Sequence, residues 1–525
     1  MLHFRGVAAI PRAGSAVRPR FVFIAVAAAC VAGALAAAVA NLDLKAQAIA
    51  FGLVTTAVGL LTVRRRAAFV LLLLVVDVQI PFYKALGPLD LSNDAGAPGL
   101  YITTVDVLLL VLYGLWWAKG TLVSDLRELF ADRGVIIPLL VLGAALPSFL
   151  VAENLWLASS ELVRVALGGA LYVYVAARVR SRRDVGVIIA GLFAIAVFQF
   201  LLIVLQWRTG VSAMLPTLGL ESSTLADRVT IQGDVIQRPN GTLFHSTVAG
   251  AVLGPIALVA LSLSLAAELP RRWRAPTVGA LVAAVVAILL AQPRASMAGL
   301  AFGGVILLLV QFRRGYVTRR LILGTAVALL LVAVVARNQV FNFLGTNLAT
   351  DHLWQEVAVR LELNDVAMHI IRDAPVFGIG LNNHETVMDR YTPHGVEFPG
   401  FPAHNLYLLT WSETGALGLL ALLIAFWVLF RYATRLARVR DPMFAALGTA
   451  LAATYVFFLI EETMAYSLRH THATLLFWLL AGLTVAASRI AASVSPGDAP
   501  PTLMSDPPAP PWPAIPRGAP HPPRR

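Results

Sequence analysis

The chain of 525 residues has a single cysteine and few charged residues. Cys30 has no second thiol to pair with, so the chain can form neither an internal disulfide nor a thiolate metal site. Only 13% of the residues are charged. The sequence also lacks a phosphate-binding P-loop, a dinucleotide-binding fingerprint and a serine-protease constellation. Nothing in it therefore indicates a nucleotide-dependent enzyme or a serine hydrolase.

Long apolar runs fill most of the chain, and 58% of its residues are hydrophobic. About 14 of these runs are long enough to cross a hydrocarbon core of ~30 Å. With so many runs, we expect the first to be an uncleaved signal-anchor. We predict an all-α fold, a polytopic transmembrane helical bundle with about 14 spans. The spans are expected at residues 21–40, 46–63, 67–82, 103–118, 135–152, 158–177, 185–206, 245–266, 276–292, 296–312, 321–336, 405–430, 443–460 and 471–488.

The net charge of +12 follows the pattern of membrane topology rather than that of a nucleic-acid partner. If the spans simply alternate, the basic clusters all fall on one side. By the positive-inside rule that side is cytoplasmic, and both termini are cytoplasmic with it. The clusters are at residues 64–66, 178–184, 271–274, 313–320 and 431–440.

Two loops on the outward side are long, and the second has internal structure. Residues 353–372 have apolar side chains near helical spacing, at Leu353, Val357, Leu361, Met368 and Ile371, which predicts an amphipathic helix on the membrane surface. The Gly-rich residues 374–385 predict a turn. The expected segments are a basic N-terminus (1–20), N-terminal helices (21–206), a periplasmic loop (207–244), central helices (245–336), a larger periplasmic loop (337–404), C-terminal helices (405–490) and a Pro-rich disordered cytoplasmic tail (491–525).

The stretch FPAHNLYLLTWSETGALG, residues 401–418, begins a predicted span with polar residues. Helical phase places His404, Gly415 and Gly418 on one face, where the small residues would admit another helix. Glu413 points roughly the opposite way and must face protein or water, because a carboxylate is costly in lipid. On position alone, His404 is an interfacial polar residue and Glu413 a structural hydrogen-bonding group.

Three arginines accompany His404 on the outward side, where the topology rule makes arginine uncommon. Arg238 precedes the span that starts at His245, Arg294 stands in a very short connection, and Arg360 lies in the predicted surface helix. Guanidinium groups bind phosphate bidentately and keep their charge, so they indicate a lipid-linked diphosphate as ligand. The alternative is that each side chain snorkels to phospholipid headgroups.

Other polar groups within the predicted spans keep a second class of function open. Glu161 and Arg164 are placed to pair on one helix. The adjacent Glu461 and Glu462 lie near an outer helix end, where we expect solvation. Acids inside spans also occur in ion-coupled transporters, which remain the competing class. The other outward histidines show no metal-ligand spacing, so we predict no metal and no other cofactor.

Residues 360–418 resemble the O-antigen ligase and O-antigen polymerase superfamily, a group of bacterial polytopic membrane glycosyltransferases. The resemblance rests on Arg360, on DAPVFGIGLNN and on HNLYLLTWSETGALG, where His-Asn is followed by Glu-x-Gly-x-x-Gly. Weaker support comes from RPNGTLFHSTVAG and QPRASMAG, around Arg238 and Arg294. The first of these departs from the family, which often has Pro-Asn at the position of His245-Ser246-Thr247.

The resemblance implies an O-antigen ligase-like glycosyltransferase of lipopolysaccharide or exopolysaccharide biosynthesis, at the periplasmic face of a bacterial inner membrane. His404 would be catalytic, and Arg238 and Arg294 would bind the diphosphate of an undecaprenyl-linked glycan, with Arg360 as a third candidate. Its other partners would be an acceptor glycan or glycolipid and membrane lipid. A polymerase and a protein O-glycan ligase remain alternatives. The residues expected to support the site are Asn405, Glu413, Gly415 and Gly418.

These residue types suit such a transfer. A diphosphate is a good leaving group, so the reaction needs a base for the acceptor hydroxyl rather than an acid. Histidine, with an ordinary pKa of ~6.5, supplies that base. Arginine supplies fixed positive charge for the departing diphosphate without a metal. In-line attack at the anomeric carbon would invert its configuration.

Overall fold

The computed structural model describes residues 62–63, 65–79, 83–90, 93, 95–131, 136–209, 227–231, 234–243, 245–266, 271–314, 350–392 and 401–494. Within these residues, eight helices are long and apolar enough to cross a membrane, or nine if one bent pair is counted as a span. Each of the eight coincides with a predicted span, which confirms a multi-pass helical membrane protein. They are α7 (Leu155–Arg178), α8 (Arg182–Thr209), α10 (Ser246–Leu265), α11 (Arg271–Ala291), α12 (Arg294–Arg313), α17 (Leu406–Leu436), α18 (Pro442–Glu461) and α19 (Thr471–Val494).

Three predicted spans take a different form. The described part of the run at 67–82 forms a short helix, α3 (Arg66–Asp77), and the run at 135–152 forms α6 (Ile136–Ala145) followed by the 3-10 helix η1 (Leu146–Leu150). The run at 103–118 forms α4 (Thr104–Ala118), which meets α5 (Leu122–Ala131) at an angle of 102°. Gly120, with a left-handed φ of 70°, ends α4 and allows this bend. The remaining predicted spans, 21–40, 321–336 and nearly all of 46–63, lie outside the described residues.

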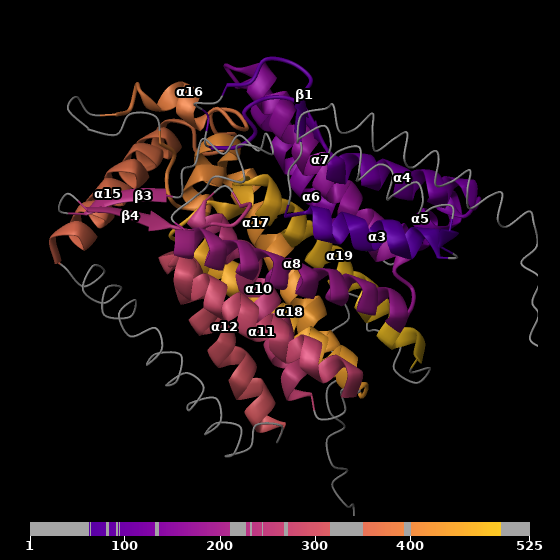
Figure 1. Cartoon of the computed structure of the whole chain (residues 1–525). Helices are drawn as coiled ribbons and strands as arrows, with labels where there is room; N and C mark the ends of the chain where they lie inside the picture. Colours follow the sequence, from indigo (N-terminus) through magenta and orange to yellow (C-terminus); the bar gives the residue numbers. More distant parts are fainter. Residues whose placement is uncertain are drawn as a thin grey trace, which may run out of the picture.

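The long helices pack into one bundle, with α10 enclosed by α11, α12 and α18 (Figure 1). α10 is buried on all sides, since its residues are small or aliphatic around the whole circumference. Glycines allow the closest approaches. A Cβ at Gly303 of α12 would lie 2.8 Å from the carbonyl oxygen of Ala453 in α18. Small residues at helix crossings are typical of membrane bundles.

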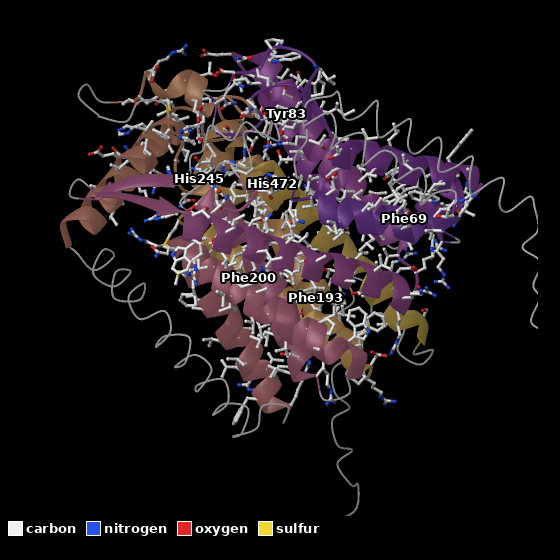
Figure 2. The ribbon with its side chains drawn as sticks, viewed as in Figure 1. Phe69, Tyr83, Phe193, Phe200, His245 and His472 are labelled. Carbon is white, nitrogen blue, oxygen red and sulfur yellow. The ribbon has the colours of Figure 1, made fainter. Side chains whose placement is uncertain are left out.

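The two ends of the bundle differ in chemistry. At one end, which we call the site end, α7, α10, α12, α17 and α19 begin, and α8, α11 and α18 end. At the other, the basic end, arginines bind between elements: Arg178 pairs with Asp125 at 2.7 Å, and Arg314 donates to Thr449 at 3.0 Å. His245, the N-cap of α10, and His472, the second residue of α19, are both labelled in Figure 2 and lie at the site end.

The described residues are mostly helical, as predicted, and they also contain two short antiparallel strand pairs. β1 (Tyr83–Ala85) pairs with β2 (Tyr101–Thr103), and β3 (Asp227–Ile231) pairs with β4 (Asp234–Arg238). The sequence DRVTIQGDVIQR carries the signal for the second hairpin, since β-branched residues flank a glycine. Hydropathy alone does not detect strands this short.

Two helices cover the site end, α15 (Thr350–Asp373) and α16 (His384–Met388) (Figure 1). The predicted helix over 353–372 is therefore present, and its buried face includes Ile371 but not Leu361 of the predicted apolar residues. Leu361 is 62% exposed, whereas Leu363, Val366 and Ile370 pack with Met388 of α16. The spacing of apolar residues fits both faces, and contact with α16 and α17 decides between them.

Candidate functional site

The polar start of α17 is a helix cap. Asn405 is the N-cap, and its side-chain oxygen accepts hydrogen bonds from the backbone N–H groups of Tyr407 and Leu408, at 3.0 and 3.2 Å. Because α17 begins at Leu406, His404 lies outside the helix. The prediction that His404 shares a helical face with Gly415 and Gly418 is therefore wrong.

His404 is only partly buried, and its ring is oriented by the main chain. Its Nδ1 lies 3.2 Å from the carbonyl oxygen of Pro402. A carbonyl oxygen only accepts, so Nδ1 carries the proton in the neutral ring and Nε2 keeps its lone pair. Burial, and next the charge of Arg360, lower the pKa of His404 to about 4. At neutral pH, His404 is therefore an uncharged ring with a basic Nε2.

An aromatic stack continues from His404 toward α19. The ring of Tyr466 lies edge-on to that of His404, with centroids 5.2 Å apart, and packs on His470 at 5.4 Å. Burial lowers the pKa of His470 to about 3, and the nearby His245 adds to this. His245, the N-cap of α10, also lowers the pKa of His404. We call these four residues the histidine cluster: His245, His404, Tyr466 and His470.

Arg360 lies close enough to His404 for its positive charge to lower the pKa of the ring. It extends from α15, and its Nη1 donates to the carbonyl oxygen of Met464 at 3.2 Å. Met464 belongs to the turn of residues 462–465 between α18 and η2 (Ser467–Arg469). Leu406, two residues after His404, donates its N–H to Glu462 and Ala465 of the same turn, each at 3.0 Å. One turn thus holds both Arg360 and the start of α17.

Arg294 is the first residue of α12, and the connection from α11 is as short as predicted. Near it, the Ser296 hydroxyl lies 3.3 Å from the carbonyl oxygen of Thr247, at the start of α10, and 3.4 Å from Glu461 of α18. Arg294 is therefore at the site end, where α10, α12 and α18 meet.

Arg238 ends strand β4, just before α10. The segment that follows it is held by α8. Gln206 accepts from the N–H of Gly241 at 2.8 Å, and Gln199 accepts from the N–H of Thr242 at 3.1 Å. A φ of 69° at Gly241 explains the glycine at this position. Two glutamines inside a span thus fix the route from Arg238 to His245.

α17 is broken at Gly415, whose φ is 68° and ψ −170°. The break frees two carbonyl groups, and the predicted turn at 374–385 binds them. Ile379 and Gly380 donate their N–H groups to Ser412 and Glu413, each at 2.9 Å. Irregular backbone at this depth requires such internal partners. The Gly-x-Gly and Glu-x-Gly stretches therefore interact through their backbones.

Neither small residue of this break admits another helix, contrary to prediction. A Cβ at Gly415 would lie 1.9 Å from the carbonyl oxygen of Val376, which belongs to the turn. A Cβ at Gly418 would meet Thr414 of the same helix, which the break turns toward it. The glycines serve a loop and a kink rather than a helix crossing.

Beneath the histidine cluster lies a network of four buried charges. Arg469 Nη1 is 2.9 Å from Glu413 Oε2, and Arg164 Nη2 is 2.8 Å from Glu161 Oε2. Arg469 Nε also approaches Glu161 at 3.7 Å and donates to the carbonyl oxygen of Ala95 at 2.7 Å. The predicted pairing of Glu161 with Arg164 is confirmed, and the charges of the network balance.

Glu461 and Glu462 differ from expectation, because both side chains are fully buried rather than solvated. The chain turns back after α18 instead of ending at the surface, and η2 covers the two carboxyl groups. Ser467 of η2 donates to Glu461 at 2.6 Å, and the N–H of Leu468 donates to Glu462 at 3.0 Å.

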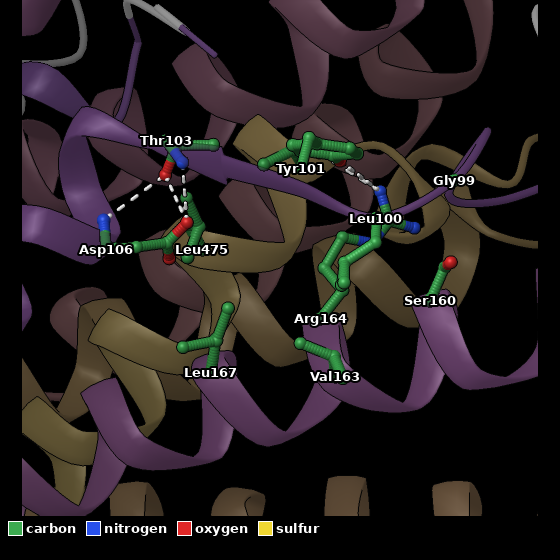
Figure 3. Close-up of a pocket in the computed structure, with 11 residues that line it drawn as sticks. Gly99, Leu100, Tyr101, Thr103, Asp106, Ser160, Val163, Arg164, Leu167 and Leu475 are labelled. Carbon is green, nitrogen blue, oxygen red and sulfur yellow. Dashed lines mark hydrogen bonds between the residues drawn. The ribbon is translucent and has the colours of Figure 1, made fainter. Parts of the chain in front are cut away.

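A pocket lies beside this network, between β2, α4, α7 and α19 (Figure 3). Arg164 and Tyr101 point toward each other across it, and Thr471 bonds to both, at 3.0 Å from Arg164 and 2.6 Å from Tyr101. Its volume of about 20 Å³ has room for about one water molecule. The pocket is therefore too small to hold a sugar in this conformation.

Residues 279–423 match a protein-family model described as O-antigen ligase. Over this segment, the chain is similar to the O-antigen ligase family. The match confirms the resemblance seen in residues 360–418. No curated protein matches the chain. The matched segment contains Arg294, Arg360 and His404, whereas Arg238 lies before it and η2 after it.

Sequence reasoning missed the part of the histidine cluster that lies outside the matched segment. His470 stands in SLRHTH, a run of polar residues directly before a predicted span, which is the same signal that drew attention to His404. His470 is far from His404 along the chain, so the sequence does not show that Tyr466 packs between the two rings. Arg469, in the same run, is the missing partner of Glu413.

Proposed function

We propose that this chain is an inverting glycosyltransferase. It transfers a glycan from undecaprenyl diphosphate to an acceptor hydroxyl at the periplasmic face of the inner membrane. One observation carries the proposal: His404 is an accessible, neutral histidine beside Arg360, within the matched segment.

In the proposed reaction, Nε2 of His404 accepts the proton of the acceptor hydroxyl as its oxygen attacks the anomeric carbon. The bond from that carbon to the diphosphate breaks, and the diphosphate leaves as an anion. Arg294, Arg360 and Arg238 supply positive charge to the leaving group, so the protein needs no metal for this step. Attack opposite the leaving group inverts the configuration at the anomeric carbon.

The low pKa of His404 affects both its protonation and its strength as a base. A ring whose pKa is about 4 is fully unprotonated at neutral pH but is a weak base. A bound diphosphate would counter the charge of Arg360, the second cause of the low pKa after burial, and so raise the pKa of His404. The donor would thus strengthen the base that acts on its acceptor.

The ion pairs of Glu161 and Glu413 favour an enzyme over a transporter. Glu161 and Glu413 are each engaged by an arginine, and buried charges that are paired in this way hold helices together. A transporter needs acids that exchange protons or ions during transport. Polymerase and protein O-glycan ligase activity differ from the proposed one only in the acceptor.

Purified protein in lipid vesicles, supplied with an undecaprenyl diphosphate-linked glycan and an acceptor, tests the proposal. We expect glycan-bearing acceptor and free undecaprenyl diphosphate in equal amounts, with the anomeric configuration inverted and the rate unchanged by a metal chelator. Movement of the intact lipid-linked glycan across the membrane without transfer would favour the transporter instead.

A further inference from the structure

Each of the adjacent residues Glu461 and Glu462 has one carboxyl oxygen with a hydrogen-bond donor and one without, among the described residues. Both carboxyl groups are buried at the site end, with 0% of each side chain exposed. Glu461 Oε1 accepts from Ser467 at 2.6 Å and from Ser296 at 3.4 Å, and Glu462 Oε1 accepts from the N–H of Leu468 at 3.0 Å. The Oε2 atoms of both residues have no donor among the described residues.

The two carboxyl groups lie within hydrogen-bonding reach of each other. Two carboxylates cannot both stay ionised at this separation in a buried place, since like charges repel and neither is solvated. Ser296 from α12, Tyr407 from α17, and Ser467 with the Leu468 N–H from η2 face the pair. These four groups are uncharged at neutral pH, whereas two cations belong to the elements around the pair: Arg360 donates to Met464 of the same turn, and Arg294 begins α12.

We propose that Glu461 and Glu462 bind one proton between their Oε2 atoms, and that this proton holds the 462–465 turn in place. A single O–H···O bond satisfies both orphaned oxygens and leaves one negative charge. That charge is stabilised by the hydroxyl and N–H groups on the Oε1 atoms.

The turn held by this proton positions the proposed catalytic groups. It accepts the N–H of Leu406 through Glu462 and Ala465, and it accepts Arg360 through Met464. The Tyr407 hydroxyl also donates to Leu459, just before it, at 2.9 Å. Glu461 and Glu462 are thus positioning residues for His404 and Arg360. This consequence rests on the proposed function, whereas the proton site does not.

Loss of the shared proton should disturb the turn. Burial, and next the neighbouring Glu461, raise the pKa of Glu462 well above its ordinary value, so the proton is lost at a higher pH than that of an ordinary carboxyl group. Above that point two adjacent carboxylates repel each other. Transfer should therefore decline on the alkaline side, where His404 itself is already neutral.

Infrared spectroscopy of the purified protein tests the proton site directly, through the carbonyl stretch of a protonated carboxyl group. In Glu461→Gln, the new amide donates to Glu462, which then needs no proton, and Glu462→Gln works in the reverse sense. We expect each single variant to lose the same band, equal to one carboxylic acid, and the double variant to lose no more. If either single variant keeps the carboxylic-acid band of the wild type, the proposal is overturned.

The pH profile of transfer tests the positioning role. Glu461→Gln should lose the alkaline decline of the wild type, because an amide donor does not titrate. Thr463→Ala is the control, since Thr463 is exposed in the same turn and its hydroxyl donates to the carbonyl oxygen of Ile460. It should keep the decline. An unaltered alkaline limb in Glu461→Gln would overturn the positioning role. If no variant and no wild type transfers glycan, the proposed function fails, and the infrared result alone decides the proton site.

Discussion

Arg469 and Glu413 form a buried ion pair that joins the turn before α19 to the break in α17. Arg469 Nη1 lies 2.9 Å from Glu413 Oε2, and Glu413 is 0% exposed. On one side, Arg469 directly precedes His470 of the histidine cluster. On the other, Glu413 is one of the residues whose carbonyl group binds the 374–385 turn. The pair therefore connects the segment that carries Tyr466 and His470 to α17, the helix that begins just after His404.

Glu413→Gln should destabilise the fold more than it slows turnover. The substitution leaves Arg469 buried without its main counter-charge, which typically costs about 3–5 kcal/mol. We expect a lower thermal unfolding midpoint in detergent and a near-normal rate per folded molecule. The matched control is the double variant Glu413→Gln/Arg469→Met, which removes both charges and should recover part of the loss. Additive losses in the double variant would show that the two residues are not coupled.

Arg360→Gln should move the acid limb of the pH–rate profile upward. Only the neutral ring of His404 accepts a proton, so transfer falls as pH drops through the pKa of His404. That pKa is lowered to about 4 by burial and next by Arg360. Removing the cation raises the pKa and moves the limb to higher pH. A limb that stays in place while the rate falls would restrict Arg360 to substrate binding.

Arg294→Lys should impair transfer nearly as much as Arg294→Ala, on the order of 10²-fold. Lysine keeps the charge but loses the bidentate fork that grips a diphosphate. Arg238→Lys should show the same pattern more mildly. Arg372→Lys serves as the control, because Arg372 is exposed near the end of α15. Full activity in both lysine variants at 294 and 238 would leave headgroup snorkelling as the sufficient account of these arginines.

The topology prediction can be tested by cysteine labelling in a Cys30→Ser background. Asp389 is exposed just after α16 at the site end, and Arg438 is exposed after α17 at the opposite end. A membrane-impermeant thiol reagent applied from outside should label Asp389→Cys and not Arg438→Cys. The reverse pattern would place the site end in the cytoplasm and remove the lipid-linked donor from reach.

The long spans could be predicted from hydropathy, because burial in lipid and burial in protein require the same apolar composition. α10 and α18 show this, since both coincide with predicted runs. The bend after α4 could not be predicted in this way, because it depends on the left-handed backbone at Gly120. The same holds for Gly415, where hydropathy continues unbroken through a helix that the backbone interrupts.

For the site, the sequence identified residue types but not their partners. Polar residues at the start of a span singled out His404, and the carboxylate inside the span singled out Glu413. Their partners, Tyr466 and Arg469, come from a turn that precedes another span, and only the packing of α17 against η2 and α19 joins them. The burial of Glu461 was missed for the same reason, since η2 covers it after α18 ends.

The central claim, that His404 is the base, is tested most directly by His404→Ala in the vesicle assay. We predict a fall in the rate of transfer of roughly 10²–10⁴-fold, with normal membrane insertion, because His404 lies outside the helix and is only partly buried. Binding of the lipid-linked donor should persist through the arginines. His369→Ala, an exposed histidine on α15, should transfer at the wild-type rate. A folded His404→Ala protein that transfers glycan at the rate of the His369→Ala control would contradict the account.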